Sequence, residues 1–388
     1  MSPPQAETVL ISGARAPVAL GIGRAFEAAG FQVDLVDSVS SFMVRWSSLR
    51  GNKMHRVRAP RADFQGFRED MRALISELRP GLIIPTCEEV FYLAGAAELD
   101  GYQDRLFAPP LSLLRRLHSK AQFAELAVAS GLEPPRTWRV TAPDELRSFP
   151  ESSRDLVFKP EFSRFGAETL VRPAAGKLAT LDVSEDKPWV VQEYVDGEEV
   201  CVWSAARGGR LIAASGYRPM WHFGGASSYF LRDRDPGLVE SCRKLAAATG
   251  ITGQISLDLM RTSDGTLRPI ECNPRAVSGV QLFAGDARLA SALIGEEPGL
   301  LTPAIAACHV GPAFWSAAAA RAVSTRSFSD AGGDARRSQD VLSGNGGTRV
   351  ALGAVLDFTR FAVKGLISSR SSTQESTADI EWNGEAIG

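Results

Sequence analysis

The chain has 388 residues, of which 44% are hydrophobic and 23% charged, and its formal net charge is −2. This is the composition of an ordinary soluble globular protein that is long enough for two or three domains. The small net charge excludes a global attraction to nucleic acid or to acidic membranes. The five scattered cysteines contain no CxxC pair, which argues against a disulfide framework or a zinc site. Because the N-terminus lacks the basic start and apolar run of a signal peptide, we expect a cytoplasmic protein.

The first 37 residues predict a strand, a glycine-rich turn, a helix and a second strand, which is a Rossmann-like unit. An NAD-dependent oxidoreductase is one interpretation of this start. However, the distance from Gly13 to Gly21 and Gly23 is too long for a GxGxxG fingerprint. None of the five tyrosines has a lysine four residues further on, as short-chain dehydrogenases require. We therefore favour a Rossmann-like unit that serves as a scaffold.

A helical pattern over residues 66–79 leads into a further apolar strand, "GLIIPTC". Glu88 and Glu89 follow this strand at its carboxyl end. Ligands of open α/β sheets bind at such ends, so both acids are substrate-site candidates. A solvated loop is the alternative.

The middle of the chain predicts a helix followed by several strands. Ser119 and Gln122 have the spacing of a capping box, so a helix should begin near Lys120 and end near Gly131. "DLVFKP" predicts an apolar strand that ends in Lys159, and a lysine is costly to bury there without a negative partner such as a phosphate. The alternative is a lysine whose amine reaches solvent. Two further strands should flank a break in "QEYVDGEEV", residues 192–200.

Residues 253–275, "GQISLDLMRTSDGTLRPIECNPR", predict a β-hairpin with Asp264-Gly265 as a two-residue turn. This register places Asp258 opposite Glu271. Two facing carboxylates repel each other, and a divalent cation between them removes that cost. Oxygen ligands without histidine suit Mg²⁺, with a solvated polar hairpin as the alternative. The same register pairs Ser256 with Asn273 and Gln254 with Arg275, and assigns Ile255, Leu257, Leu259, Ile270 and Cys272 to a core.

The last ninety residues carry no motif with a chemical interpretation. Residues 299–320 have no formal charge but are interrupted by prolines and glycine, so we expect a buried alanine-rich helix and no membrane insertion. Residues 324–349 are rich in Ser, Gly and Arg and predict a loose linker. Residues 350–367 predict an amphipathic helix.

The order of these pieces resembles the ATP-grasp superfamily, notably its carbamoyl phosphate synthase and D-alanine ligase branches. The resemblance covers residues 1 to about 290, and its best-defined motifs lie between about 118 and 280. It implies an α/β and α+β fold class: a Rossmann-like parallel-sheet domain followed by a two-lobed ATP-grasp fold. The implied domains are residues 1–108, a first lobe at 109–186, a second lobe with the metal site at 187–300, and an extension at 301–388 that contains the linker.

The resemblance also implies ATP and Mg²⁺ as cofactors, with Mn²⁺ as an alternative metal. Lys120 and Lys159 match the two lysines that hold the ATP phosphates. "FSRFGAE" stands where the family has its phosphate-covering loop, in which Ser163, Arg164 and Gly166 would donate hydrogen bonds. The metal ligands would be Asp258, Glu271 and Asn273.

The hinge between the lobes would contact the adenine through the backbone of Glu193 and Val195, next to Tyr194. Gln192 stands where relatives often have glutamate, and Glu199 would accept the ribose hydroxyl groups. Arg275 matches an arginine that stabilises the anionic intermediate, so Arg275 and Lys159 are the catalytic candidates. A structural salt bridge is the alternative for Arg275. Further upstream of the hairpin, Arg218 is a candidate for gripping a substrate carboxylate.

These assignments predict a ligase that activates a carboxylate as an acyl phosphate, which an amine or similar nucleophile then attacks. A carboxyphosphate-forming enzyme that uses bicarbonate and a non-catalytic nucleotide-binding protein remain alternatives. The expected partners are a small carboxylate and an amine, with no nucleic acid. A homodimer is compatible with the sequence.

Overall fold

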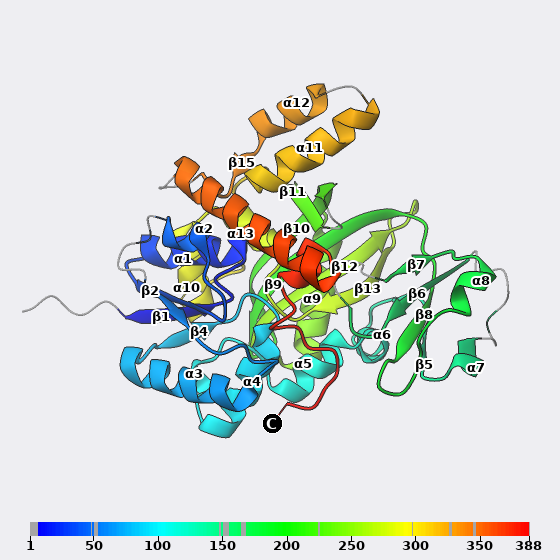
Figure 1. Cartoon of the computed structure of the whole chain (residues 1–388), viewed down its shortest axis with the longest axis horizontal. Coiled ribbons are helices and arrows are strands. Elements are labelled where there is room, and N and C mark those ends of the chain that lie inside the picture. The colour runs from blue at the N-terminus through cyan, green and yellow to red at the C-terminus, as the bar shows by residue number, and fades with distance from the viewer. Residues whose placement is uncertain are drawn as a thin grey trace, which may run out of the picture.

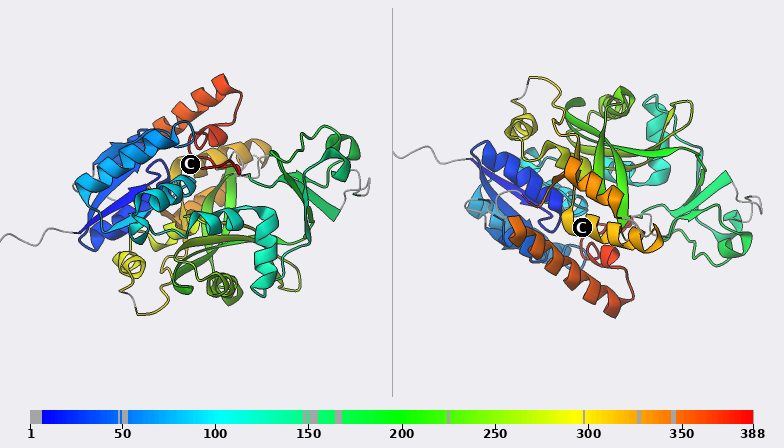
Figure 2. Two further views of the ribbon diagram at one scale, coloured as in Figure 1. Left: turned by 90° about the horizontal axis from the view of Figure 1, so that it is seen from below. Right: turned by 90° about the horizontal axis from the view of Figure 1, so that it is seen from above.

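Figure 1 shows the computed structural model, which describes residues 7–47, 49, 53–146, 149, 155–163, 168–223, 226–296, 298–325, 328–343 and 347–387. Three sheets follow one another in the sequence. The N-terminal sheet and the small middle sheet lie at opposite ends of the molecule, with the large third sheet between them (Figures 1 and 2).

The first sheet is parallel, with the strand order β3–β2–β1–β4. Its strands and the helices between them are β1 (Thr8–Ser12), α1 (Pro17–Ala28), β2 (Gln32–Asp37), α2 (Phe42–Arg45), β3 (Met54–Arg56), α3 (Phe64–Leu78), β4 (Leu82–Ile84) and α4 (Glu89–Asp100). The central strands are continuous apolar runs, as expected for parallel strands covered on both faces. The predicted Rossmann-like start is confirmed. The helix expected at 66–79 begins slightly earlier because the Asp63 side chain accepts a hydrogen bond from the Gly66 N–H at 2.8 Å.

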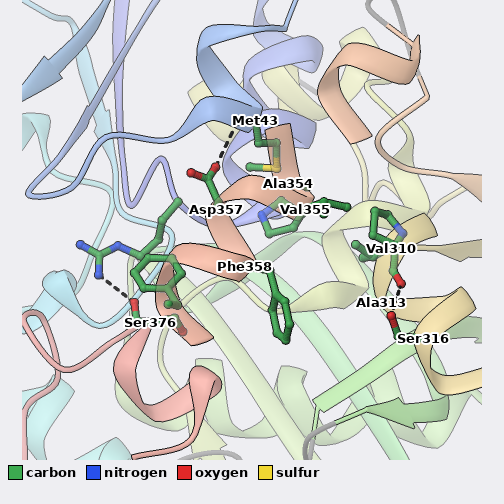
Figure 3. A pocket seen from close by; sticks show the side chains of 13 residues that line it. Met43, Val310, Ala313, Ser316, Ala354, Val355, Asp357, Phe358 and Ser376 are labelled. Atoms are coloured by element: carbon green, nitrogen blue, oxygen red, sulfur yellow. Dashed lines mark hydrogen bonds between the residues drawn. The ribbon is translucent and has the colours of Figure 1, made fainter. Parts of the chain in front are cut away.

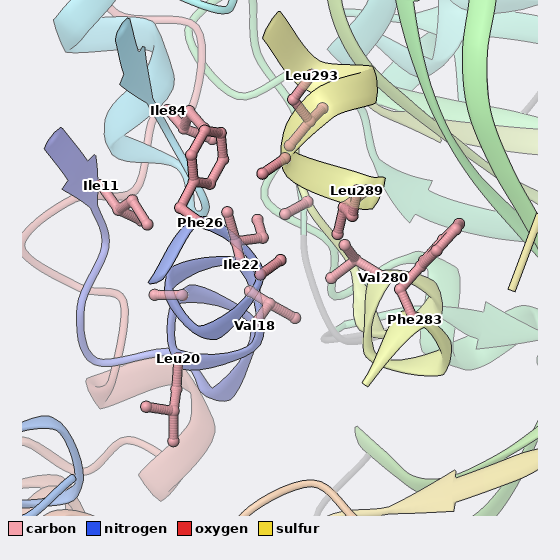
Figure 4. Close-up of a cluster of buried hydrophobic side chains, with 14 of the residues drawn as sticks. Ile11, Val18, Leu20, Ile22, Phe26, Ile84, Val280, Phe283, Leu289 and Leu293 are labelled. Atoms are coloured by element: carbon pink, nitrogen blue, oxygen red, sulfur yellow. The ribbon is translucent and has the colours of Figure 1, made fainter. Parts of the chain in front are cut away.

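α1 joins this sheet to the rest of the molecule. Val18, Ile22 and Phe26 belong to one buried cluster with Val280 and Leu289, which come from the 3₁₀ helix η3 (Ser278–Phe283) and from α10 (Ala287–Ile294). Figure 4 shows these side chains meeting between the blue N-terminal helix and the yellow segments. The parallel sheet and the segment after the predicted metal hairpin therefore share one core.

The second sheet is small and antiparallel, with the order β5–β8–β6–β7. The chain reaches it through η1 (Gln103–Arg105), α5 (Leu111–His118) and α6 (Lys120–Ala129). The sheet consists of β5 (Thr137–Val140), β6 (Leu156–Pro160), β7 (Leu170–Val171) and β8 (Trp189–Glu193), with α7 (Pro143–Leu146) and α8 (Ala175–Leu178) between strands. α6 begins at Lys120 as predicted, because Ser119 caps it by accepting from the Gln122 N–H at 3.2 Å.

The third sheet has seven strands in the order β13–β12–β9–β10–β11–β14–β15. Its elements are β9 (Glu198–Arg207), β10 (Arg210–Phe223), β11 (Ala226–Asp233), α9 (Pro236–Thr249), β12 (Gly253–Arg261), β13 (Leu267–Asn273), β14 (Ala307–His309) and β15 (Gln339–Asp340). Successive residues of β9 serve different cores, since Val202 packs with α9 while Trp203 packs toward α1 and η3. Both faces of the sheet are therefore covered at β9.

The β12–β13 hairpin has the predicted pairing at its functional end. Asp258 lies opposite Glu271, and Ser256 opposite Asn273. The predicted two-residue turn is wrong: Thr262 pairs with Thr266 by hydrogen bonds, and Gly265 adopts a left-handed φ of 86° in a three-residue loop.

A β-bulge in the hairpin compensates for that difference of one residue. Leu259 pairs with Pro269, so Ile270 is the extra residue of β13. Ile270 is consequently only half-buried, and its assignment to the core is wrong, while Leu259 and Cys272 are in the core as predicted. Because of this bulge, the predicted pairing of Asp258 with Glu271 is correct although the turn is one residue longer.

The C-terminal extension is more structured than expected. A helix over all of 299–320 is wrong: residues 307–309 form β14, and α11 (Gly311–Thr325) begins after it. Where a loose linker was expected, the described residues of 324–349 contain α12 (Ser329–Arg337) and β15. α13 (Gly347–Ser368) and α14 (Ser372–Glu375) follow. No helix in the described parts of the chain is long and apolar enough to cross a membrane.

Candidate active site

Two lysines of the middle region reach the carboxylate hairpin of the third sheet. Lys159 is the penultimate residue of β6, is buried, and donates a hydrogen bond to the carbonyl group of the bulged residue Ile270 at 3.4 Å. Lys120 opens α6, and its Nζ lies 3.7 Å from Glu271 Oε2. Lys120 also donates to the side-chain and backbone oxygens of Ser163 at 3.1 and 3.3 Å. The structure thus brings together four residues that sequence analysis placed around ATP.

The two facing carboxyl groups differ in their electrostatics. Burial and the nearby Glu271 raise the pKa of Asp258 to about 7. Burial alone would also raise the pKa of Glu271, but Lys120 and Lys159 outweigh it and the pKa lies below its usual range. Burial lowers the pKa of Lys159 to about 8, against the opposing effect of Glu271. The pKa values of Asp258 and Lys159 are therefore both shifted toward neutrality, and shifted pKa values of this kind are typical of functional sites.

The oxygen atoms of this hairpin fit a divalent cation in composition. Asn273 Nδ2 donates to Asp258 Oδ2 at 3.1 Å and to Glu271 Oε1 at 3.4 Å, so the amide bridges both acids. To act as a ligand, Asn273 would have to turn its oxygen toward them. Among the described residues, no group of three or more His, Cys, Asp or Glu side chains could hold a metal. A cation here would take two carboxylates and complete its shell with other oxygens, as Mg²⁺ does with phosphates.

Arg275 lies just beyond the hairpin and is tied to the parallel sheet. Its guanidinium donates to Glu88 Oε1 at 3.2 Å and to Asn273 Oδ1 at 3.2 Å. Glu88 in turn faces His118 at 3.9 Å between Oε2 and Nε2. Glu88 therefore belongs to this site, and Arg275 has the salt bridge that was the alternative interpretation. Its contact with Asn273 still directs it toward the predicted metal ligands.

The neighbouring acid, Glu89, has a different environment. It accepts hydrogen bonds from the Ser12 hydroxyl at 2.7 Å and from the Thr86 N–H at 3.1 Å. These contacts fix the end of β1 to the start of α4. We therefore find Glu89 in a structural network and not among the residues that surround Arg275.

Sequence analysis missed Glu161, a buried acid that organises the lysine side of the site. It accepts hydrogen bonds from the Ser119 hydroxyl and from Arg139 Nε, the latter at 2.7 Å. Its carbonyl oxygen accepts from Lys120 Nζ at 3.4 Å. A signal was available, since Glu161 follows Lys159 by two residues at the end of an apolar strand.

The predicted hinge residues connect β8 to β9. The N–H groups of Glu193 and Tyr194 donate to the Arg136 and Asp155 carbonyl oxygens at 3.0 and 2.8 Å. Gln192 is buried and donates to the Thr137 hydroxyl at 2.9 Å. No backbone hydrogen bond of the Val195 N–H occurs within the described part of the chain. Of this segment, the Val195 N–H is the donor best placed to serve a ligand.

The remaining candidate residues have three different outcomes in the structure. Glu199 is an exposed residue of β9, paired in register with Met260. Arg218 forms ion pairs with Glu198 and Asp233 at 3.5 and 3.7 Å, so it is not a free carboxylate clamp. Arg164 and Gly166 of the predicted phosphate-covering loop lie outside the described residues.

Sequence analysis also missed the end of the chain, for which no sequence signal was available and which packs against Phe162 and His118. Trp382 is buried and stacks on Phe91 with ring centroids 4.9 Å apart. Its ring also lies against Phe162 at 5.1 Å and His118 at 6.1 Å. Phe162 directly precedes Ser163, which binds Lys120. The tail thus contacts both Phe162, which begins the segment that we call the phosphate-side loop, and His118, which faces Glu88.

The small antiparallel sheet that carries Lys159 thus lies against the hairpin that carries the paired acids. No protein-family model matches the chain, and no curated protein does. Solved structures of ATP-grasp enzymes do match it. The L-amino acid ligase from Bacillus licheniformis has a TM-score of 0.56 at 17% identity, with 75% of each chain covered.

Two further matches have similar extents. The phosphoribosylamine–glycine ligase from Thermotoga maritima has a TM-score of 0.58 at 16% identity, covering 76% of this chain and 78% of that one. The N5-carboxyaminoimidazole synthetase from Staphylococcus aureus has a TM-score of 0.59 at 11% identity, covering 76% and 79%. The chain therefore has the ATP-grasp fold, and the predicted fold class is confirmed.

Proposed function

We propose that the protein is an ATP- and Mg²⁺-dependent ligase that activates a carboxylate as an acyl phosphate for attack by an amine. The observation that carries this proposal is the approach of Lys120, from α6, and of Lys159, from β6, to the hairpin that carries Asp258 and Glu271. Cations on one side and acids on the other suit a metal–triphosphate complex, in which each charged group finds a partner.

In this proposal the chain contributes positioning and charge. Lys120 and Lys159 hold the phosphates, assisted by Ser163 and the loop that contains Gly166, and Arg275 stabilises the negative charge that develops during transfer. The carbonyl of Glu193 and the N–H of Val195 bind the adenine edge next to Gln192 and Tyr194, and Glu199 accepts the ribose hydroxyl groups. Asp258, Glu271 and Asn273 would hold a bound Mg²⁺, or Mn²⁺, which would neutralise negative charge on the phosphates.

The acceptor chemistry has two candidates. Similar structures include amine ligases, such as the phosphoribosylamine–glycine ligase, and carboxylating enzymes, such as the biotin carboxylase from Campylobacter jejuni. The contact of Arg275 with both Glu88 and Asn273 favours a small anionic intermediate, which either an acyl phosphate or a carboxyphosphate supplies. We propose the amine ligase, with the bicarbonate reaction as the second candidate.

We also propose the division of the chain at residues 108, 186 and 300. The first unit would supply the sheet edge that carries Glu88, the second Lys120 and Lys159, and the third the acids. The extension from 301 would contribute Trp382, which packs against Phe162 and His118 at the edge of the site. In this division each proposed unit supplies part of one charged cluster.

A thermal-shift experiment tests the nucleotide and separates it from the oxidoreductase alternative. Mg-ATP should raise the melting temperature, because a ligand that binds only the native state stabilises it. NADH and NADPH should leave it unchanged, and the opposite pattern would overturn the proposal. A screen of acid and amine pairs for phosphate release, with bicarbonate as one acid, then identifies the reaction. Mg-ATP binding without phosphate release from any pair, bicarbonate included, would favour a non-catalytic nucleotide-binding protein.

A further inference from the structure

α13 has two apolar faces, and the residues that the structure describes cover only one of them. The covered face packs through Gly353 and Phe361, and a Cβ on Gly353 would come within 2.7 Å of the Met43 backbone N. Asp357 of the same face accepts hydrogen bonds from the backbone N–H groups of Phe42 and Met43 at 3.0 Å each. These contacts fix the rotation of the helix about its axis, so the opposite face has a defined orientation toward solvent.

The outward face is an aliphatic stripe. At 100° per residue, its members lie within about 60° of one line along the helix. Leu366 and Ile367 are 84% and 82% exposed. The stripe consists of Leu352, Val355, Leu356, Thr359, Val363, Leu366 and Ile367. Thr359 fits among them, because its hydroxyl donates to the Val355 carbonyl at 2.8 Å and leaves the methyl group for contact.

Two other surface helices of the protein, α3 and α9, lack such a stripe. α3 is also long and amphipathic, yet none of its described residues is a large exposed hydrophobic side chain. The same holds for α9. The expectation of an amphipathic helix at 350–367 is therefore correct only for the inner face. A contiguous exposed apolar surface of this kind usually marks an interaction site.

The charges around the stripe are all of one sign. Arg349 and Lys364 are exposed along one edge, with the half-buried Arg360 between them. Asp357 is the single acidic residue of α13, and it is turned inward and hydrogen-bonded. The face is therefore complementary to an apolar surface that carries negative charge.

Neighbouring elements extend this surface. The first turns of α11 and the middle of α13 line an apolar pocket of about 270 Å³, whose walls include Val310, Ala313, Val355 and Phe358 (Figure 3). Trp315, also on α11, is 48% exposed. Tryptophan is enriched where proteins meet the boundary of a bilayer. Figure 2 shows α13, in orange-red, along the outside of the molecule.

We propose that α13 is a membrane-surface helix that lies flat on anionic lipid, with its aliphatic stripe in the acyl boundary and its basic edge at the headgroups. Aliphatic residues with flanking Lys and Arg are typical of interfacial helices. A second copy of the chain is a poorer occupant in an antiparallel pairing. Such a pair brings equal edges together and would place Arg349 of one copy near Lys364 of the other.

Vesicle co-sedimentation of the full chain tests this proposal without any activity assay. Vesicles of phosphatidylcholine mixed with phosphatidylglycerol should bind the protein, and vesicles of phosphatidylcholine alone should bind it much less. Leu366→Glu should lower the partition coefficient at least about tenfold, because a carboxylate replaces a buried aliphatic side chain. Arg349→Gln with Lys364→Gln should lower it by a factor on the order of ten, since each basic residue near an anionic surface contributes about fivefold.

Leu99→Glu is the matched control, because Leu99 is a helical leucine that is 56% exposed on α4, away from the stripe. It should bind vesicles like the wild type. Absence of binding to anionic vesicles would overturn the proposal, and so would equal losses in Leu366→Glu and Leu99→Glu. A wild-type dimer in sedimentation velocity that Leu366→Glu converts to a monomer would assign the stripe to a protein interface instead.

Discussion

Asp258 and Glu271 lie directly opposite each other on β12 and β13, and Lys120 Nζ lies 3.7 Å from Glu271 Oε2. The pKa of Asp258 rises to about 7 through burial and the charge of Glu271, while Lys120 and Lys159 lower the pKa of Glu271. In the metal-free protein, the ionised form of Asp258 is therefore the one that burial and repulsion destabilise. A cation that neutralises Asp258 would link ligand binding to the stability of the hairpin.

Replacing Asp258 should stabilise the metal-free protein. An unfolded aspartate titrates near pH 4, whereas the folded carboxyl keeps its proton to about pH 7. The folded state therefore loses stability as the pH rises from about 4 to 7, and the penalty is complete above that range. Asp258→Asn should raise the free energy of unfolding at pH 8 by roughly 1–3 kcal/mol, and should change it little at pH 4. Urea unfolding in the presence of EDTA measures both values.

Glu271→Gln is the informative comparison for that experiment. It removes the charge that opposes Asp258, but it also removes the partner of Lys120, so a gain as large as that of Asp258→Asn is not expected. Both variants should lose Mg-dependent turnover, because each removes one negative charge from the proposed metal site. A gain from Asp258→Asn that is the same at pH 4 and pH 8 would contradict the charge-based explanation.

Lys159 should contribute mainly to nucleotide binding. Its amine is buried beside Ile270 and Glu271, where a phosphate would be a strong partner. Lys159→Met keeps much of the side-chain volume and removes the charge. The dissociation constant for Mg-ATP should rise by a factor on the order of ten to a hundred, from the loss of a charged hydrogen bond of about 1.5–3 kcal/mol. Calorimetric titration measures this constant, and an unchanged value would exclude Lys159 from phosphate binding.

Arg275 should act on catalysis, but a single substitution cannot show this cleanly. Arg275→Ala leaves Glu88 buried without its cation, which costs about 3–5 kcal/mol of stability. The double variant Arg275→Gln with Glu88→Gln removes both charges and should recover most of that loss. If Arg275 stabilises the developing charge, the double variant should still lose at least about tenfold in kcat. Its affinity for Mg-ATP should change little.

Glu88→Gln alone is the control for that comparison, because it retains the arginine. A double variant with normal kcat and much weaker Mg-ATP binding would make Arg275 a nucleotide contact. Normal kcat together with normal binding would leave it as a structural salt bridge only.

The sequence predicted the hairpin pairing because alternation and a strong turn signal are local properties. Even there, the turn differs by one residue, and the compensating bulge at Ile270 has no sequence signal that we recognised. Lys159 and Lys120 could be placed because a buried-strand end and a helix cap are also local. The contact of Glu161 with Ser119 joins segments about forty residues apart, and that of Trp382 with Phe162 joins segments more than two hundred apart. Such contacts depend on tertiary packing, which composition and periodicity do not encode.

The tail should influence nucleotide binding through Phe162. Gly384 has a φ of +100°, and a Cβ at this position would lie 2.8 Å from Phe162 Cε2. Gly384→Ala should therefore displace the Phe162 ring and with it Ser163, whose oxygens receive the hydrogen bonds of Lys120. We expect Gly384→Ala to weaken Mg-ATP binding at least about fivefold, equivalent to roughly 1 kcal/mol. Calorimetric titration of the full chain measures this change.

Gly101→Ala separates that effect from simple backbone strain. Gly101 has a φ of +75°, and a Cβ there meets nothing within 4 Å. Both variants pay the cost of a left-handed residue, about 1–2 kcal/mol, so both should unfold at a lower urea concentration. Only Gly384→Ala should also bind Mg-ATP more weakly, because only its side chain meets the loop beside Lys120. If the two variants keep equal, wild-type affinity for Mg-ATP, the tail stabilises the fold without positioning the phosphate-side loop.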